Sequence, residues 1–277
     1  MPRAAQVRID LSSKPGNVAV VRQALGGLAD ATGLSPADLN DIGIAVTEAC
    51  NNASVHAYDG AEGPLRVEIH AGERVLQATV RDYGVGLGVD VSQASFPTDL
   101  DGELFGIGLP SIQGLADHVH WSEPSDGGTL VEMQFSVDPL SWTGEGGVAD
   151  IERPAIAAED LPSTIEVGMA PLAVTRGVLP RVLRANAARA GFSFERHSAA
   201  QRVVATLLAD VSSWALSGAV QARLVVTGGR IELAVGPMTP AAASRLASAV
   251  CPIAPRLSAS VVDLSDGGQR TVVRLER

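Results

Sequence analysis

Hydrophobic and polar positions in the first half of the chain follow two periods, that of a strand and that of a helix. Three segments alternate with a period of two, which predicts strands at residues 7–11, 65–70 and 75–81. Two further strands are expected at residues 118–123 and 129–137, on either side of Asp126-Gly127-Gly128. Helical spacing of apolar residues predicts helices over 18–31 and near 109–118. A long helix is expected from Pro36 to about Ala57, because Ser35-Pro36-Ala37-Asp38 is typical of a helix start. The order of these elements predicts an α/β domain.

The second half follows a segment with the composition of a linker. Residues 138–167 are rich in glycine, proline and acidic residues, which divides the chain into domains at 1–137 and 168–277. Beyond the linker, short patterns of the first half recur in the same order. Residues 173–176 resemble 19–22, 190–193 resemble 32–35, 231–235 resemble 76–80, and Ser265-Asp266-Gly267-Gly268 repeats residues 125–128. The ordered series favours a tandem duplication of one αβ unit, although any two αβ domains can share such turn residues.

Composition narrows the class of protein. The 277 residues are 46% hydrophobic and 19% charged, which is enough apolar material for a buried core. The net charge is −10 and the sequence has no basic cluster, so direct binding of nucleic acid is not expected. A signal-peptide pattern and a membrane-spanning apolar run are both missing, so a cytoplasmic protein away from the membrane is expected. Cys50 and Cys251 are expected to be buried, reduced thiols.

The long helix carries the first candidate motif. Glu48 and Asn52 are four residues apart and therefore lie on one helix face. A carboxylate and an amide oxygen there suit Mg²⁺, which takes few protein oxygens together with waters and phosphates. Alone the signal is weak, because such pairs occur by chance on solvated helices. Asn51 and Asn52 inside an otherwise apolar helix go against helix propensity, which is a hint of function.

Two further motifs follow. Asp82 comes at the end of an alternating strand, where a buried carboxylate can accept a hydrogen bond from an exocyclic amine. Gly84 and Gly86 would let the backbone approach a flat ligand closely, although a plain Asp-x-Gly turn explains the motif equally well. Gly106 and Gly108 precede a helix, where free amides can face an anion. A single Gly-x-Gly is weak evidence.

In this order and spacing, the three motifs resemble the N, G1 and G2 boxes of the GHKL (Bergerat-fold) ATPase superfamily. The residues from Ala45 to Tyr58 look most like those of the anti-sigma-factor serine kinases, and the resemblance covers about residues 5–137. It implies an α+β two-layer sandwich that binds ATP or ADP with Mg²⁺.

The resemblance also implies roles for individual residues. Asn52 would ligate Mg²⁺, Glu48 would orient or deprotonate the attacking hydroxyl, and Asp82 would accept from the adenine amine. Gly84 and Gly86 would admit the base, and Thr129 would support it through a water. Gly106, Gly108 and Leu109 would cradle the phosphates. His56 and Tyr58 are expected to pack at the helix end instead of taking part in catalysis.

The second half lacks these motifs. Leu207 stands in the place of Glu48, and Pro237 replaces Asp82. We therefore expect an inactive second copy that does not bind ATP in this way. Members of the resembled family act as homodimers, so the second copy is expected to form an intrachain pseudo-dimer with the first, with a homodimer as the alternative.

Two functions follow from the resemblance. The first is a serine kinase that phosphorylates an anti-anti-sigma (STAS-type) partner, with sequestration of a sigma factor as a further expectation. The second is a nucleotide-gated protein-binding module with little or no kinase activity. The second is favoured by the acidic segment 99–105, which has no cation to stabilise phosphoryl transfer.

Overall fold

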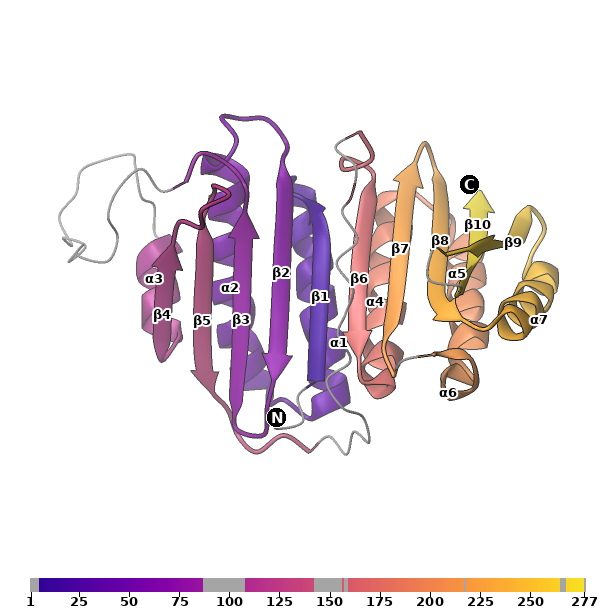
Figure 1. Ribbon diagram of the computed structural model, residues 1–277, viewed down its shortest axis with the longest axis horizontal. Helices are drawn as coiled ribbons and strands as arrows, with labels where there is room; N and C mark the ends of the chain where they lie inside the picture. The colour runs from indigo at the N-terminus through magenta and orange to yellow at the C-terminus, as the bar shows by residue number, and fades with distance from the viewer. Residues whose placement is uncertain are drawn as a thin grey trace.

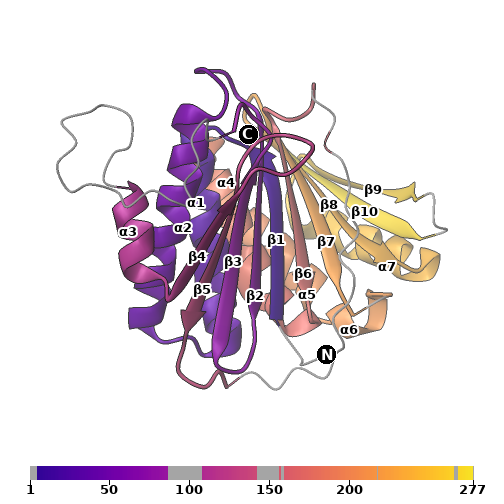
Figure 2. The ribbon, with the colours of Figure 1, turned by 60° about the vertical axis from the view of Figure 1, so that its left-hand side comes forward.

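A computed structural model describes residues 5–86, 108–141, 156, 159–216, 218–264 and 268–276. They form a ten-stranded sheet in the order β4-β5-β3-β2-β1-β6-β7-β8-β10-β9, in which all neighbours are antiparallel. The helices gather on one face of this sheet (Figures 1 and 2). The strands are β1 (Ala5–Ser12), β2 (Pro64–Ala71), β3 (Val75–Asp82), β4 (His118–Ser122), β5 (Leu130–Ser136), β6 (Thr164–Ala170), β7 (Val220–Thr227), β8 (Arg230–Met238), β9 (Leu257–Asp263) and β10 (Gln269–Glu276).

The helices are α1 (Val18–Thr32), α2 (Pro36–His56), α3 (Gly108–Leu115), α4 (Leu172–Arg189), α5 (Phe194–Leu208), α6 (Val211–Trp214) and α7 (Pro240–Val250), with short 3₁₀ turns at Pro15–Asn17 and Cys251–Ile253. The core lies between this helical layer and the sheet, and it includes the fully buried Ile9, Leu28, Ile42 and Ile69. The mixed α/β class and the five strands expected in the first half are confirmed.

Local signals set the limits of the first two helices. α1 ends at Gly33, whose φ of 72° is in the left-handed region that glycine adopts without a steric cost. Ser35 caps the start of α2, and its hydroxyl accepts a hydrogen bond from the Asp38 amide at 3.1 Å. The predicted helix start is therefore confirmed, and it fixes the phase with which α2 lies on the sheet.

The two halves have the same order of elements. In the first, β1, α1, α2, β2, β3, α3, β4 and β5 follow one another, and the corresponding order in the second is β6, α4, α5, β7, β8, α7, β9 and β10. In both halves the sheet runs outward from the first strand in the same sequence. This repetition supports the duplication, which stays a prediction. One difference is that the second helix of the second half is interrupted: α5 ends at Leu208 and the short α6 follows.

The halves meet at the centre of the sheet. β1 pairs with β6 in a register that runs from Gln6 opposite Ala170 to Asp10 opposite Glu166. Behind this pair α1 packs on α4, and a Cβ placed on Gly177 would lie 2.1 Å from the Gly27 carbonyl oxygen. Side chains larger than hydrogen would therefore push the two helices apart. β6 begins at Thr164, inside the range expected to be linker, and its residues are all buried.

The cysteines differ from each other in their surroundings. Both are free thiols; Cys50 is buried in α2, and burial raises the pKa of its thiol to about 12. Cys251 is exposed, so the expectation of a buried thiol is wrong there, because the residue begins the 3₁₀ turn after α7.

Among the described residues, no helix is long and apolar enough to cross a membrane.

Candidate functional site

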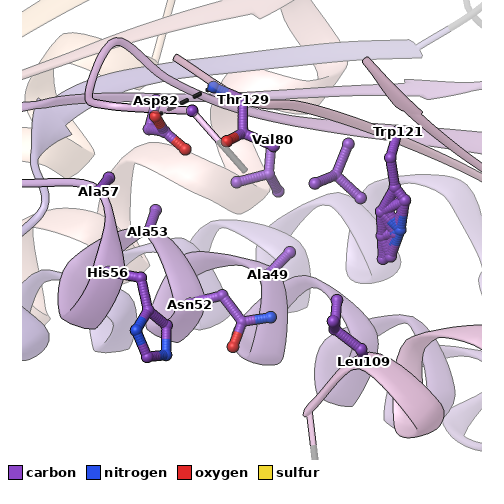
Figure 3. A pocket seen from close by; sticks show the side chains of 12 residues that line it. Ala49, Asn52, Ala53, His56, Ala57, Val80, Asp82, Leu109, Trp121 and Thr129 are labelled. Atoms are coloured by element: carbon purple, nitrogen blue, oxygen red, sulfur yellow. Dashed lines mark hydrogen bonds between the residues drawn. The ribbon is translucent and has the colours of Figure 1, made fainter. Parts of the chain in front are cut away.

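A cavity lies between α2 and the strands β3, β5 and β4 (Figure 3). Its volume is about 690 Å³ when the space at its open mouth is included. The lining residues come from α2, the sheet and the start of α3. They are Ala49, Asn52, Ala53, His56, Ala57, Val80, Asp82, Gly86, Leu109, Trp121, Thr129 and Val131. Of the predicted site residues, Asn52, Asp82, Gly86, Leu109 and Thr129 are thus brought together.

Two walls give the cavity the shape of a slot. On the sheet side, Val80 pairs with Val131 and Val131 with Trp121, so their side chains form one row across three strands. On the helix side, Ala49, Ala53 and Ala57 follow one another at intervals of one turn. Methyl groups leave space between a helix and a sheet that larger side chains would fill. The resulting apolar slot can take a flat ring.

Asp82 supplies the polar group at one end of the slot. It is only 5% exposed, and its Oδ1 accepts hydrogen bonds from the Gly84 amide at 3.0 Å and the Thr129 amide at 3.1 Å. Among the described residues no hydrogen bond ends on Oδ2. Figure 3 shows the carboxylate turned toward α2 across the slot. One oxygen thus anchors the side chain, and the other is available to a ligand.

The turn before β5 is built around this carboxylate. The Asp82 amide donates to the Thr129 carbonyl at 3.0 Å, so the two residues are joined by two hydrogen bonds. Gly128 has a φ of 76°, and a Cβ there would lie 2.2 Å from the Asp82 carbonyl oxygen. Glycine is needed at this position because the two segments approach so closely.

Gly84 and Gly86 have different places. A Cβ on Gly84 would lie 1.9 Å from the Ala57 carbonyl oxygen, which accepts from the Val85 amide at 3.0 Å. Gly84 therefore lets the turn after β3 pack on the end of α2, and it is not one of the residues that line the slot. Gly86, with a φ of 79°, does line it. A close approach of the backbone to a ligand is therefore possible at Gly86. The need for glycine at position 84 comes instead from its contact with Ala57.

Asn52 and Glu48 face two different hollows, although they are one turn apart on α2. Asn52 lines the slot. Glu48 lines a groove between α1 and α2 together with Arg22, Leu25, Leu39, Asn40, Gly43, Ile44 and Thr47. Of the phosphate-binding residues expected from the sequence, Leu109 lines the slot at the start of α3, Gly108 is the first residue of that helix, and Gly106 lies outside the described residues, as does the segment 99–105.

Seven of the twelve lining residues were not among the predicted site residues, and two of the seven, His56 and Trp121, have polar side-chain atoms. His56 is exposed and lines the slot, so the expectation that it packs at the helix end is wrong. Its spacing of four from Asn52 was a usable signal. Trp121 enters the slot only because β4 pairs with β5, and no local pattern indicates it. Tyr58 does pack as expected: its hydroxyl donates to the Pro64 carbonyl at 2.5 Å and accepts from the Tyr83 amide at 2.8 Å. Burial raises the pKa of its phenol to about 12.

The second half has a different arrangement at the corresponding place. Pro237 lies near the end of β8, where β3 has Asp82, and it offers no side-chain acceptor. α5 ends at Leu208, before the turn that would correspond to Asn52. The chain then forms α6 and pairs Ala215 with Met238 at the end of β8. Trp214 of α6 is 2% exposed, and its indole N–H donates to the Leu207 carbonyl at 2.8 Å.

Comparison with known proteins places the first half in a family. Residues 11–135 match the histidine kinase-like ATPase domain. The serine-protein kinase RsbW of Bacillus licheniformis is 34% identical over 142 residues, which cover 48% of this chain and 87% of that protein. The chain belongs to the GHKL ATPase family, of the RsbW type. RsbW of Halalkalibacterium halodurans is 33% identical over 133 residues, covering 46% of this chain and 80% of the relative. RsbW of Listeria innocua is 32% identical over 121 residues, covering 41% and 77%.

Membership in the GHKL family agrees with where the slot lies. The matched range contains α2 with Asn52, β3 with Asp82, and the turn at Thr129 that leads into β5. The residues after 135, including all of β6 to β10, lie outside that range.

Proposed function

We propose that the first half binds ATP with Mg²⁺ and transfers phosphate to a serine of an anti-anti-sigma (STAS-type) protein. Sequestration of a sigma factor belongs to the same proposal, and so does a cytoplasmic location. The observation that carries it is the slot itself. One carboxylate oxygen of Asp82 is anchored by two amides and the other is open, at the end of an apolar space shaped for a flat ring.

The residues of the slot fit an adenine nucleotide. Asp82 Oδ2 accepts from the exocyclic amine, and the alanines of α2 and the valines of the sheet cover the two faces of the ring. Asn52 also lines the slot, and its side chain offers one amide oxygen to Mg²⁺. A single protein oxygen suits this ion, which otherwise keeps waters and phosphate oxygens. When bound, ATP and Mg²⁺ supply the phosphoryl group and neutralise charge on it.

Glu48 is the residue we assign to the acceptor hydroxyl. Glu48 lines the groove between α1 and α2 and does not line the slot. A carboxylate there can accept the hydroxyl proton without competing for the purine. The groove also contains apolar surface, including Ile44, which is 41% exposed, and the charged Arg22. This mixture suits a peptide segment that brings its serine toward Glu48.

The second half takes the place of a second subunit in this proposal. It repeats the order of elements, continues the sheet through β1 and β6, and packs α4 on α1. With Pro237 in the place of Asp82, it has no equivalent acceptor for a base. We therefore propose an intrachain pseudo-dimer with one nucleotide site per chain. A homodimer built through β1 would need the edge that β6 already occupies.

Phosphate transfer with labelled ATP tests the function. The purified full chain is incubated with γ-labelled ATP, Mg²⁺ and a STAS-type protein, and label on serine is the expected result. Glu48→Gln should abolish transfer and leave nucleotide affinity within about twofold, since Glu48 lies outside the slot. Asp41→Asn removes an exposed carboxylate of the same helix and should transfer normally. Full transfer by Glu48→Gln would show that Glu48 has no catalytic role.

A second function is favoured by one feature of the sequence. The segment 99–105 carries Asp99, Asp101 and Glu103 and no cation, which disfavours stabilisation of the transferring phosphoryl group. This second function is that of a nucleotide-gated binding module, which binds ATP or ADP without efficient phosphate transfer. Tight binding of ATP and ADP, with partner affinity that differs between the two and with no label transfer, would support this alternative.

A further inference from the structure

Trp121 closes the slot on the side of the sheet edge. It lies on β4, the edge strand of the first half, and it lines the cavity together with Leu109 of α3 (Figure 3). Its side chain continues the row formed by Val131 and Val80. Two strand spacings separate it from β3, and Asp82 is two residues beyond Val80. By ordinary strand geometry the two Cα atoms are therefore roughly 12 Å apart.

The indole N–H of Trp121 has no hydrogen-bond acceptor among the described residues. The nitrogen, Nε1, is buried. A buried donor without a partner costs about 1–3 kcal/mol, so such groups in native proteins usually meet an acceptor when a ligand or water is present. Trp214, the tryptophan described in the second half, differs in this respect, because its N–H donates to the Leu207 carbonyl at 2.8 Å. The unmet donor therefore belongs to a residue that lines the cavity.

We propose that Trp121 contacts the bound nucleotide, its ring forming the end wall of the slot and its N–H donating to an oxygen of the ligand. The inference rests on the proposed nucleotide binding and adds a residue to it. The separation from Asp82 decides which part of the ligand is involved. A base held at Asp82 presents its far side toward Trp121, where the ribose and the phosphates follow. The acceptor in this proposal is one of their oxygens, toward the start of α3 where Leu109 lies.

This role makes two measurable properties of the site depend on Trp121. The first is affinity, because the ring buries apolar surface of the ligand and the N–H contributes a hydrogen bond. The second is fluorescence, because a nucleotide against the indole ring changes the surroundings of this tryptophan directly. A structural role in β4 alone would change stability and leave both properties as they are in the parent.

Titration with ADP and Mg²⁺ by calorimetry and tryptophan fluorescence tests the inference. Trp121→Phe keeps an aromatic ring without the N–H and should lose about threefold to tenfold in affinity. Trp121→Leu also removes the ring and should lose more than about tenfold. The fluorescence change seen with the parent should be missing in Trp121→Phe. Trp214→Phe is the matched control and should keep both the affinity and the fluorescence change.

The outcomes separate this inference from the function on which it rests. If the parent binds ADP and both Trp121 variants bind within twofold of it, the assignment of Trp121 is overturned while nucleotide binding stands. If the parent itself binds no adenine nucleotide, the proposed function falls, and the inference falls with it. Thermal melting of each variant shows whether it is folded, and Trp121→Phe provides the decisive comparison should Trp121→Leu fail to fold.

Discussion

Asp82→Asn is the substitution that separates the recognition of the base from the integrity of the fold. In the parent, Oδ1 of Asp82 accepts from the amides of Gly84 and Thr129. An asparagine can keep its oxygen on those two donors, so the turn before β5 keeps its anchor. The NH₂ group then takes the place of Oδ2 and presents a donor to the adenine amine, which is also a donor. Binding should weaken while the protein stays folded.

The size of the effect follows from the lost hydrogen bond. A hydrogen bond to a charged group contributes about 1.5–3 kcal/mol, which corresponds to about tenfold to 150-fold in affinity. The anchoring bonds are kept, so the melting temperature should change by no more than a few degrees. Asp82→Ala, in contrast, removes the acceptor of two amides and should destabilise the turn as well.

Calorimetric titration with ATP and Mg²⁺ measures this effect. The matched control is Asp126→Asn, which removes an exposed carboxylate from the same turn before β5. Asp126 is exposed and pairs with Arg81 Nη2 at 2.6 Å, outside the slot. The control should bind within about twofold of the parent. Equal affinity of Asp82→Asn, the parent and Asp126→Asn would refute the assignment of the base to this end of the slot.

Two further predictions concern the junction of the halves. Gly177→Ala should lower the free energy of unfolding by roughly 1–3 kcal/mol, measured by urea denaturation, because its Cβ would lie 2.1 Å from the Gly27 carbonyl oxygen. Gly43→Ala in α2 meets no atom within 4 Å and should instead stabilise by about 0.5–1 kcal/mol; a Gly177 variant as stable as the parent would refute the tight contact. Glu166 is 5% exposed; burial is the main cause that raises the pKa of its carboxyl above the ordinary 4.5, while Arg223 at 3.7 Å opposes the shift. Ionisation is therefore less favourable in the folded state, and this residue's contribution to stability should fall as pH rises from about 4.5. Glu166→Gln should remove that part of the slope of unfolding free energy against pH, and an unchanged slope would contradict it.

Much of the first half could be predicted from the sequence because its signals are local. The alternation of β2 and β3, the hydroxyl cap at Ser35 and the left-handed glycine at position 33 each act over a few residues. Asp82 could also be singled out from the sequence, because it follows an alternating strand, where a carboxylate can accept a hydrogen bond from a ligand, although a plain Asp-x-Gly turn gives the same pattern. The same local reasoning proposed a base-admitting role for Gly84. Local patterns cannot predict the close contact of Gly84 with Ala57, because Ala57 lies 27 positions earlier in the sequence.

The features that only the tertiary structure decided depend on pairings between distant residues. Trp121 reaches the slot through the register of β4 on β5, and the two halves become one sheet through the register of β1 on β6. The hydrophobic pattern along a strand indicates which face each residue occupies, but it does not indicate which strand lies beside it. The sequence by itself therefore indicated the elements of the first half and singled out Glu48, Asn52 and Asp82 as candidate site residues. The tertiary structure decided which of them share a cavity, because strand pairing and helix packing set those distances.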